Sequence, residues 1–206
     1  VSPASVPLLS GGFRFDQGHL KSSLLLFEKG DTNFSGFADK FRLVPLGEFI
    51  PDLPIINSMG LSAVGGVYPG SKSRLFKWSG PTFATSICYE ISNGRLLAEA
   101  VSNGGKWILS IANLDPYPKA LQRQYLALAQ LRSIETSRDL IISANTGPSA
   151  LILANGIISN KMDPFVERFD IFSLHTSDYI TGYSIWREFP LFLGSIIIVI
   201  WLSFEN

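Results

Sequence analysis

The sequence predicts a layered α/β or α+β protein in which short strands alternate with a few helices. Buried-strand runs such as Trp107–Ala112 lie between segments with helical periodicity, and Asn155-Gly156 is a hairpin signal between two later strands. The 206 residues are 46% hydrophobic, which is enough for a sizeable core and excludes global disorder. We therefore expect one sheet-containing domain with helices packed on it.

The charged residues and cysteines exclude several functional classes. The 17 Lys and Arg residues match 17 Asp and Glu residues, so the zero net charge gives no electrostatic reason to expect nucleic acid. One Cys cannot form an internal disulfide, and with two His residues it does not suggest an ordinary zinc site. The mean hydropathy of +0.23 is high for a soluble domain, which indicates that apolar residues are concentrated somewhere.

The first half of the chain is predicted to contain mainly strands. A turn at Asp16-Gln17-Gly18 joins the first two strands, and Ser79-Gly80 separates the last two. The expected strands are Leu8–Phe15, Ser22–Glu28, Phe41–Val44, Tyr68–Trp78 and Pro81–Cys88.

The second half is predicted to alternate helices and strands. Arg95–Ser102 and Lys119–Ser137 have helical spacing, and in the longer segment apolar residues recur every three or four positions. These recurring residues are Leu121, Tyr125, Leu128, Leu131 and Ile134. The expected strands are Trp107–Ala112, Leu140–Ala144, Ala150–Leu153 and Ile157–Ser159.

The hydrophobic excess lies at the C-terminus, where Phe189–Phe204 has no charged residue. As a helix it would be about 24 Å long, somewhat short of a bilayer core of about 30 Å. Because the run is apolar all round, we expect a transmembrane helix, with a buried strand or core helix as the alternative. The preceding aromatic stretch, Tyr179–Glu188, is expected to be an interfacial arm, with packing on the sheet domain as the alternative.

Four residues could carry chemistry. Cys88 ends a predicted strand just before a helix, a turn that can expose a nucleophile, although a lone Cys is more often a small buried hydrophobe. Lys40 precedes a predicted strand and would ordinarily be a surface residue. Glu48 follows a tight turn that could aim its carboxylate inward, and Glu90 lies two residues past Cys88.

Three ordered segments together resemble a known family: DKFRLVPLGEFIP (Asp39–Pro51), SICYEI (Ser86–Ile91) and LRSIETSRDLIISANTGPSALI (Leu131–Ile152). They are similar to blocks of the nitrilase (carbon–nitrogen hydrolase) superfamily and, more narrowly, of the apolipoprotein N-acyltransferase family. That family ends its catalytic domain with a membrane helix, which Phe189–Phe204 would match. The resemblance implies an αββα sandwich over residues 1–178, incomplete at its N-terminus, then an arm at 179–188 and a membrane helix at 189–204.

The resemblance implies roles for individual residues. Cys88 matches the nucleophile, and Lys40 matches the cation that stabilises the oxyanion. Glu48 and Glu90 match supporting acidic positions, Tyr89 matches the residue beside the nucleophile, and Asn113 matches a strand-end Asn. No metal or other cofactor is implied.

The family's third catalytic residue, a general-base Glu, has no counterpart before Lys40. Glu28 precedes Lys40 but lacks the family's Pro-Glu context, so the base is expected upstream of this chain. A Cys without its base loses orders of magnitude in rate, so the 206 residues alone are expected to be inactive.

The implied reaction moves an acyl chain from a phospholipid, through a Cys88 thioester, to the N-terminal diacylglyceryl-cysteine of an apolipoprotein. The implied location is the bacterial inner membrane, with the catalytic domain on the periplasmic face of a multi-pass protein. The alternatives are a membrane-tethered nitrilase or amidase hydrolase and a non-catalytic, degenerate fragment. The loop Leu114–Pro118 and Leu46 depart from the family pattern, which leaves the preferred lipid open.

Overall fold

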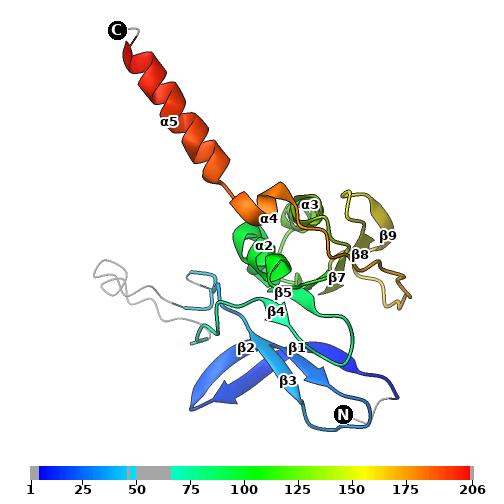
Figure 1. Cartoon of the computed structure of the whole chain (residues 1–206). Coiled ribbons are helices and arrows are strands. Elements are labelled where there is room, and N and C mark those ends of the chain that lie inside the picture. The colour runs from blue at the N-terminus through cyan, green and yellow to red at the C-terminus, as the bar shows by residue number, and fades with distance from the viewer. Residues whose placement is uncertain (1–4, 46, 50–65, 205–206) are drawn as a thin grey trace.

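The computed structural model describes residues 5–45, 47–49 and 66–204 and contains two sheets (Figure 1). The smaller sheet has the order β1-β2-β3, and the larger has the order β4-β5-β6-β7-β8-β9. The strands are β1 (Leu8–Asp16), β2 (His19–Phe27), β3 (Gly36–Asp39), β4 (Leu75–Phe76), β5 (Phe83–Ile87), β6 (Ile108–Asn113), β7 (Leu140–Asn145), β8 (Ser149–Ile152) and β9 (Ile158–Met162). The helical elements are the 3-10 turn η1 (Cys88–Ser92), α2 (Gly94–Ser102), α3 (Lys119–Thr136), α4 (Gly182–Trp186) and α5 (Phe189–Phe204).

The first hairpin forms where the sequence predicts it. β1 and β2 are antiparallel, with Asp16 opposite His19, so Gln17 and Gly18 make a two-residue turn. Both turn residues have positive φ, as this class of tight hairpin requires. On the following strand Leu24 and Leu26 alternate with more exposed residues and bury one face of the small sheet.

The larger sheet has a parallel centre, in which β5 pairs with β6 and β6 with β7. α2 and α3 form the crossover connections between these strands, as parallel pairing requires. The strands are buried, and their core residues include Ala84, Ile108 and Leu140. Because parallel strands end at the same edge, Ile87, Asn113 and Asn145 share one edge of the sheet.

α3 lies where the periodicity predicts a helix, although only some of the recurring apolar residues are buried. Tyr125 is buried and bonds Ser110 Oγ through its hydroxyl at 2.7 Å, whereas Leu121, Leu131 and Ile134 are exposed. The other buried residues of α3 are Gln122, Ala129, Arg132, Ser133 and Thr136. α3 carries apolar residues on two faces, so their spacing alone does not identify the face that packs on the sheet.

The predicted strand Phe41–Val44 is also wrong, because β3 ends at Asp39. The backbone N–H groups of Phe41 and Arg42 donate to the side chain of Glu90 and are not available to a neighbouring strand. The predicted strand Tyr68–Trp78 is reduced to β4, and Pro81–Cys88 is reduced to β5.

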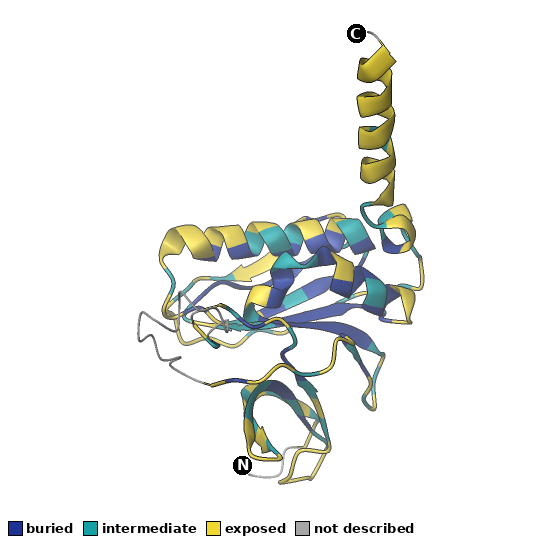
Figure 2. Ribbon diagram, turned by 90° about the vertical axis from the view of Figure 1, so that its left-hand side faces the viewer, coloured by how far each residue is buried: buried dark blue, intermediate teal, exposed yellow. Residues whose placement is uncertain are grey.

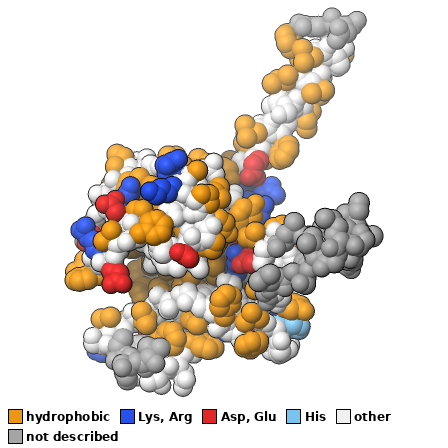
Figure 3. Space-filling model, turned by 180° about the vertical axis from the view of Figure 1, so that it is seen from behind, with side chains coloured by type: hydrophobic (Ala, Val, Ile, Leu, Met, Phe, Trp, Pro, Cys, Tyr) orange, Lys and Arg blue, Asp and Glu red, His pale blue; other side chains and the backbone are white. Residues whose placement is uncertain are grey.

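The C-terminal segment packs on the body and then leaves it. Buried Arg138 donates to the carbonyl of Tyr179, and Thr181 donates to the carbonyl of Glu135, so the 179–188 segment lies against α2 and α3. α5 then projects away with no buried residue (Figure 2), and hydrophobic side chains cover it along its length (Figure 3). None of the helices in the described part of the chain is long and apolar enough to cross a membrane.

Candidate active site

Cys88 lies at the turn between β5 and η1, at the carboxyl edge of the parallel strands. Its φ of +54° is in the left-handed region, which non-glycine residues rarely occupy. Such backbone strain often occurs at functional sites. The turn places the thiol at the end of a fully buried strand while leaving it partly accessible, a suitable position for a nucleophile.

Lys40 is buried beside this turn, with only 1% of its surface exposed. Its Nζ donates to both carboxylate oxygens of Glu48, each at 2.7 Å. Glu48 also accepts a hydrogen bond from the backbone N–H of Val44 at 2.8 Å, so its carboxylate is aimed inward. The counter-ion allows a charged ammonium to stay in the interior, which an unpaired lysine could not do cheaply.

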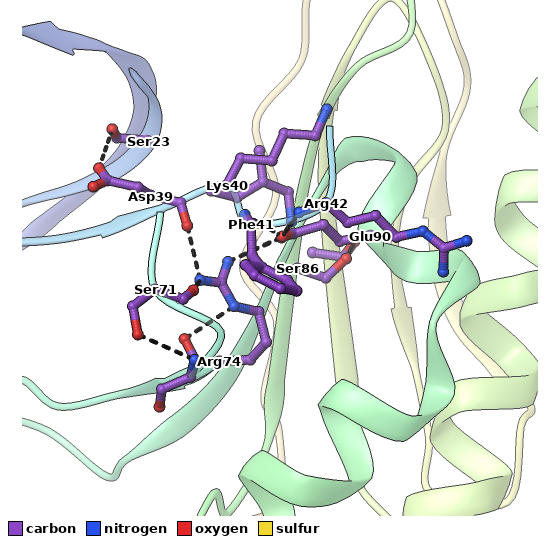
Figure 4. A network of polar contacts seen from close by, with 12 residues as sticks. Ser23, Asp39, Lys40, Phe41, Arg42, Ser71, Arg74, Ser86 and Glu90 are labelled. Carbon is purple, nitrogen blue, oxygen red and sulfur yellow. Dashed lines mark hydrogen bonds and ion pairs between the residues drawn. The ribbon is translucent and has the colours of Figure 1, made fainter. Parts of the chain in front are cut away.

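Glu90 joins the segment of Lys40 to the turn of Cys88. Figure 4 shows its carboxylate beside Phe41 and Arg42. One carboxylate oxygen accepts from the N–H groups of Phe41 at 2.7 Å and Arg42 at 3.0 Å. The other accepts from the N–H of Ile87 at 2.9 Å. These N–H groups follow Lys40 and precede Cys88 in the chain, so one carboxylate fixes two segments that are distant in sequence.

Burial raises the pKa of the Cys88 thiol above its ordinary value, and this is the largest influence on it. The charge of Lys40 lowers this pKa, while those of Glu48 and Glu90 raise it. The thiol is therefore mainly protonated near neutral pH. Because the thiolate is the reactive form, attack on a carbonyl requires a base to remove the proton.

Tyr89 and Asn113 are less closely engaged than the four charged or nucleophilic residues. Tyr89 is exposed, and the guanidinium carbon of Arg42 lies 5.2 Å from its ring centroid. Asn113 is exposed at the end of β6, where its side-chain oxygen accepts from the N–H of Asp115. The structure thus brings Lys40 and Cys88 together with the two glutamates, while the Asn113 amide caps its own loop.

Two residues of this region, Tyr117 and Arg74, are not among the candidate site residues that the sequence predicts. Burial raises the pKa of Tyr117, and the charges of Cys88 and Glu48 raise it further, so its phenol shares their electrostatic environment. Its place just after the carboxyl end of a central strand is the one clue to it. Arg74, which pairs with Glu90, precedes β4 and belongs to no motif.

A mostly apolar pocket of about 560 Å³ is lined by residues that neighbour Lys40 and Glu48 in the chain. Two of its lining residues, Phe41 and Phe49, directly follow Lys40 and Glu48 in the chain. Its described lining is Phe41, Arg42, Leu43, Phe49, Gly66, Val67, Tyr68 and Pro69. In the ranges that the structure describes, no group of three or more His, Cys, Asp or Glu residues could hold a metal ion.

Solved structures identify the class of fold. A carbon–nitrogen hydrolase from Helicobacter pylori has a TM-score of 0.59 at 16% identity, over 77% of this chain and 58% of its own. Saccharomyces cerevisiae Nit3, a member of the nitrilase superfamily, also has a TM-score of 0.59, at 13% identity over 78% of this chain and 56% of its own. An amidase from Nesterenkonia, with acrylamide added at its active-site cysteine, has a TM-score of 0.60 at 14% identity, over 92% of this chain and 69% of its own. The chain therefore has the nitrilase-type α/β fold.

Curated relatives identify the family more narrowly. Apolipoprotein N-acyltransferases from two strains of Prochlorococcus marinus are 57% and 53% identical to the chain, over 93% and 97% of its length. The chain belongs to the apolipoprotein N-acyltransferase family by this similarity. It spans only 38% and 40% of the lengths of these two relatives. No family model matches the chain.

Proposed function

We propose that this chain is the catalytic part of an N-acyltransferase that matures bacterial lipoproteins. Its donor is a membrane phospholipid, and its acceptor is the N-terminal diacylglyceryl-cysteine of an apolipoprotein. The observation that carries the proposal is the buried Lys40–Glu48 pair, joined through Glu90 to the strained turn of Cys88. The names of the relatives support N-acyl transfer to an apolipoprotein.

In the first half-reaction a base removes the proton of Cys88, and the thiolate attacks the ester carbonyl of the phospholipid. Lys40 stabilises the oxyanion that forms, an interaction stronger in the transition state than in the ground state. The intermediate collapses to a thioester, and the lysophospholipid oxygen leaves with the proton that the base returns.

In the second half-reaction the α-amino group of the acceptor attacks the thioester. An amide bond forms, the carbon–sulfur bond breaks, and the proton lost by the amine restores the Cys88 thiol. The donor and the acceptor use the same site one after the other, which is a ping-pong mechanism. We assign the base to a carboxylate other than Glu48 and Glu90, because one holds Lys40 and the other holds three backbone N–H groups.

The apolar pocket favours acyl transfer from a lipid over hydrolysis of a small amide. Its volume of about 560 Å³ lies in the usual range of small-molecule pockets, and its lining is mostly apolar. Leu43, Phe49 and Val67 offer an acyl chain an apolar wall in a pocket that begins one residue after Lys40.

We further propose that α5 is embedded in the bacterial inner membrane, with residues 1–178 as the periplasmic catalytic domain. Its 16 uncharged, mostly apolar residues would extend about 24 Å into a hydrocarbon core of about 30 Å. Exposed Trp186 and Phe189 would then lie at the interface, at the end of an arm formed by residues 179–188. An anchor of this kind keeps the site at the surface where both substrates are confined.

A chimera tests the proposed activity. In it, this chain replaces the matching stretch of the Prochlorococcus marinus relative, and N-acylation of a diacylated lipopeptide by labelled phospholipid is measured. The chimera should transfer label, Cys88→Ser should not, and Lys161→Met, an exposed change on β9, should behave as wild type. Release of free fatty acid without transfer would support a hydrolase instead. A folded chimera that neither transfers nor hydrolyses would support the non-catalytic alternative.

A further inference from the structure

Arg74 is a buried arginine next to the proposed catalytic residues, and no motif singles it out. Only 2% of its surface is exposed. One guanidinium nitrogen donates to both oxygens of Glu90, at 3.1 and 3.2 Å. The other terminal nitrogen donates to the carbonyl oxygens of Asp39 at 2.7 Å and Ser71 at 2.5 Å (Figure 4).

These contacts hold both peptide bonds that flank Lys40. The carbonyl of Asp39 belongs to the peptide bond before Lys40 and accepts from Arg74. The N–H of Phe41 belongs to the peptide bond after Lys40 and donates to Glu90, the partner of Arg74. Since Glu90 also accepts from Ile87, the same ion pair fixes the backbone just before Cys88.

We propose that Arg74 is a positioning residue that aligns Lys40 with Cys88 through Glu90 and keeps the charge of Glu90 from competing for Lys40. The inference rests on the proposed function, in which Lys40 and Cys88 act together. The carboxylate of Asp39 does not need Arg74, because Arg14 and Ser23 already bond it. The guanidinium of Arg74 is therefore free to compensate Glu90.

The charges around the thiol give this role a measurable consequence. Among the residues that the structure describes, the titratable groups that interact electrostatically with Cys88 are Lys40, Glu48, Glu90, Tyr117 and Tyr125. With Arg74 present, two cations balance the two carboxylates. Without it, the carboxylate of Glu90 keeps its three N–H donors but loses its cationic partner, and its uncompensated charge opposes formation of the thiolate.

The test measures the apparent pKa of Cys88 from the rate at which iodoacetamide alkylates the folded 206-residue chain across pH. Arg74→Met should raise this pKa by about one unit, a tenfold loss of thiolate at any pH below it. Arg74→Met combined with Glu90→Gln should return the pKa to near wild type, because the uncompensated charge is gone. Lys72→Gln removes an exposed cation nearby that pairs with Glu99, and should cause no shift.

Arg74→Lys separates charge from alignment. A single ammonium supplies the charge but cannot reach Glu90 and the Asp39 carbonyl as a guanidinium does. This variant should keep the wild-type thiol pKa, yet lower kcat of the chimera at least tenfold with little change in KM for phospholipid. It also serves as the test if Arg74→Met does not fold.

A wild-type pKa in folded Arg74→Met, or full kcat in Arg74→Lys, would overturn the inference. So would an Arg74→Met shift that persists unchanged in the double variant. A wild-type chimera that fails to transfer acyl groups would refute the proposed function. The alkylation assay does not depend on acyl transfer, so the pKa of Cys88 would still test the role of Arg74.

Discussion

The candidate active site and helix α5 are stabilised in opposite ways. In the site, each buried charge has a partner within the chain: Lys40 pairs with Glu48, and Glu90 with Arg74. In α5 no residue is buried, and its large apolar side chains face outward. The site is ordered by internal electrostatics, whereas α5 makes no buried contact and exposes its apolar side chains along its length. Changes in one region should therefore leave the other unaffected.

The largest expected effect is on the chemistry of the site. Lys40→Met removes the cation that stabilises the oxyanion and should slow thioester formation by the chimera about 10²–10³-fold. Single-turnover measurement with labelled phospholipid checks this. An undiminished rate would contradict the role of Lys40. The same variant should leave binding of the chain to lipid vesicles unchanged, since α5 is intact.

The next effect concerns stability of the site. Glu90→Gln breaks a buried ion pair and should lower the free energy of unfolding by about 3–5 kcal/mol. Urea denaturation of the 206-residue chain measures it. Glu99→Gln is the control, because its pair with Lys72 is exposed and should contribute no more than about 1 kcal/mol. An equal loss of unfolding free energy in Glu90→Gln and Glu99→Gln would contradict the claim that the buried ion pair stabilises the site.

A third prediction tests α5. Ile197→Lys places a charge in the middle of the apolar helix and should cost about 2.5–3.5 kcal/mol in membrane insertion, which weakens vesicle binding about 100-fold. Sedimentation with vesicles measures it. Phe165→Lys makes the matching change at an exposed apolar residue of the body and should have little effect. Equal weakening by both would mean that α5 is not the membrane-binding element.

The smallest effect is a dependence of stability on pH. Because burial raises the pKa of Cys88 in the folded chain, the folded state holds its proton more tightly than the unfolded state. Stability should then fall as pH rises above the ordinary thiol pKa of about 8.5, by at most about 1.4 kcal/mol for each unit by which the pKa is raised. Cys88→Ala should lack this component of the fall. Identical pH profiles for the two proteins would contradict a raised pKa.

Much of the fold follows from local sequence signals. The turn at Gln17-Gly18, the helix Gly94–Ser102 and the strand Ile108–Asn113 depend on neighbouring residues, so their positions were predictable to within a residue or two. Phe41 and Arg42 were not, because their N–H groups bond Glu90, which is 49 and 48 residues further along the chain. Local patterns cannot reveal a partner that only the tertiary fold supplies.

The same distinction applies to the site. Lys40, Glu48, Cys88 and Glu90 stand in recognisable sequence blocks, and the fold brings them into one region. Arg74 stands in none, since its importance comes from the burial of Glu90 and from the carbonyl of Asp39, which is 35 residues away. A family motif identifies the residues that take part in the reaction more readily than the residues that position them.

The central claim is that Cys88 carries an acyl group between two lipids. Its most direct test is mass spectrometry of the chimera after incubation with phospholipid alone. The peptide containing Cys88 should gain the mass of one acyl chain. Hydroxylamine should remove this chain, as expected for a thioester. Addition of a diacylated lipopeptide should also remove it, with formation of an amide on the lipopeptide. N-acylation of the lipopeptide without any adduct on Cys88, or an adduct that the lipopeptide cannot accept, would contradict the account.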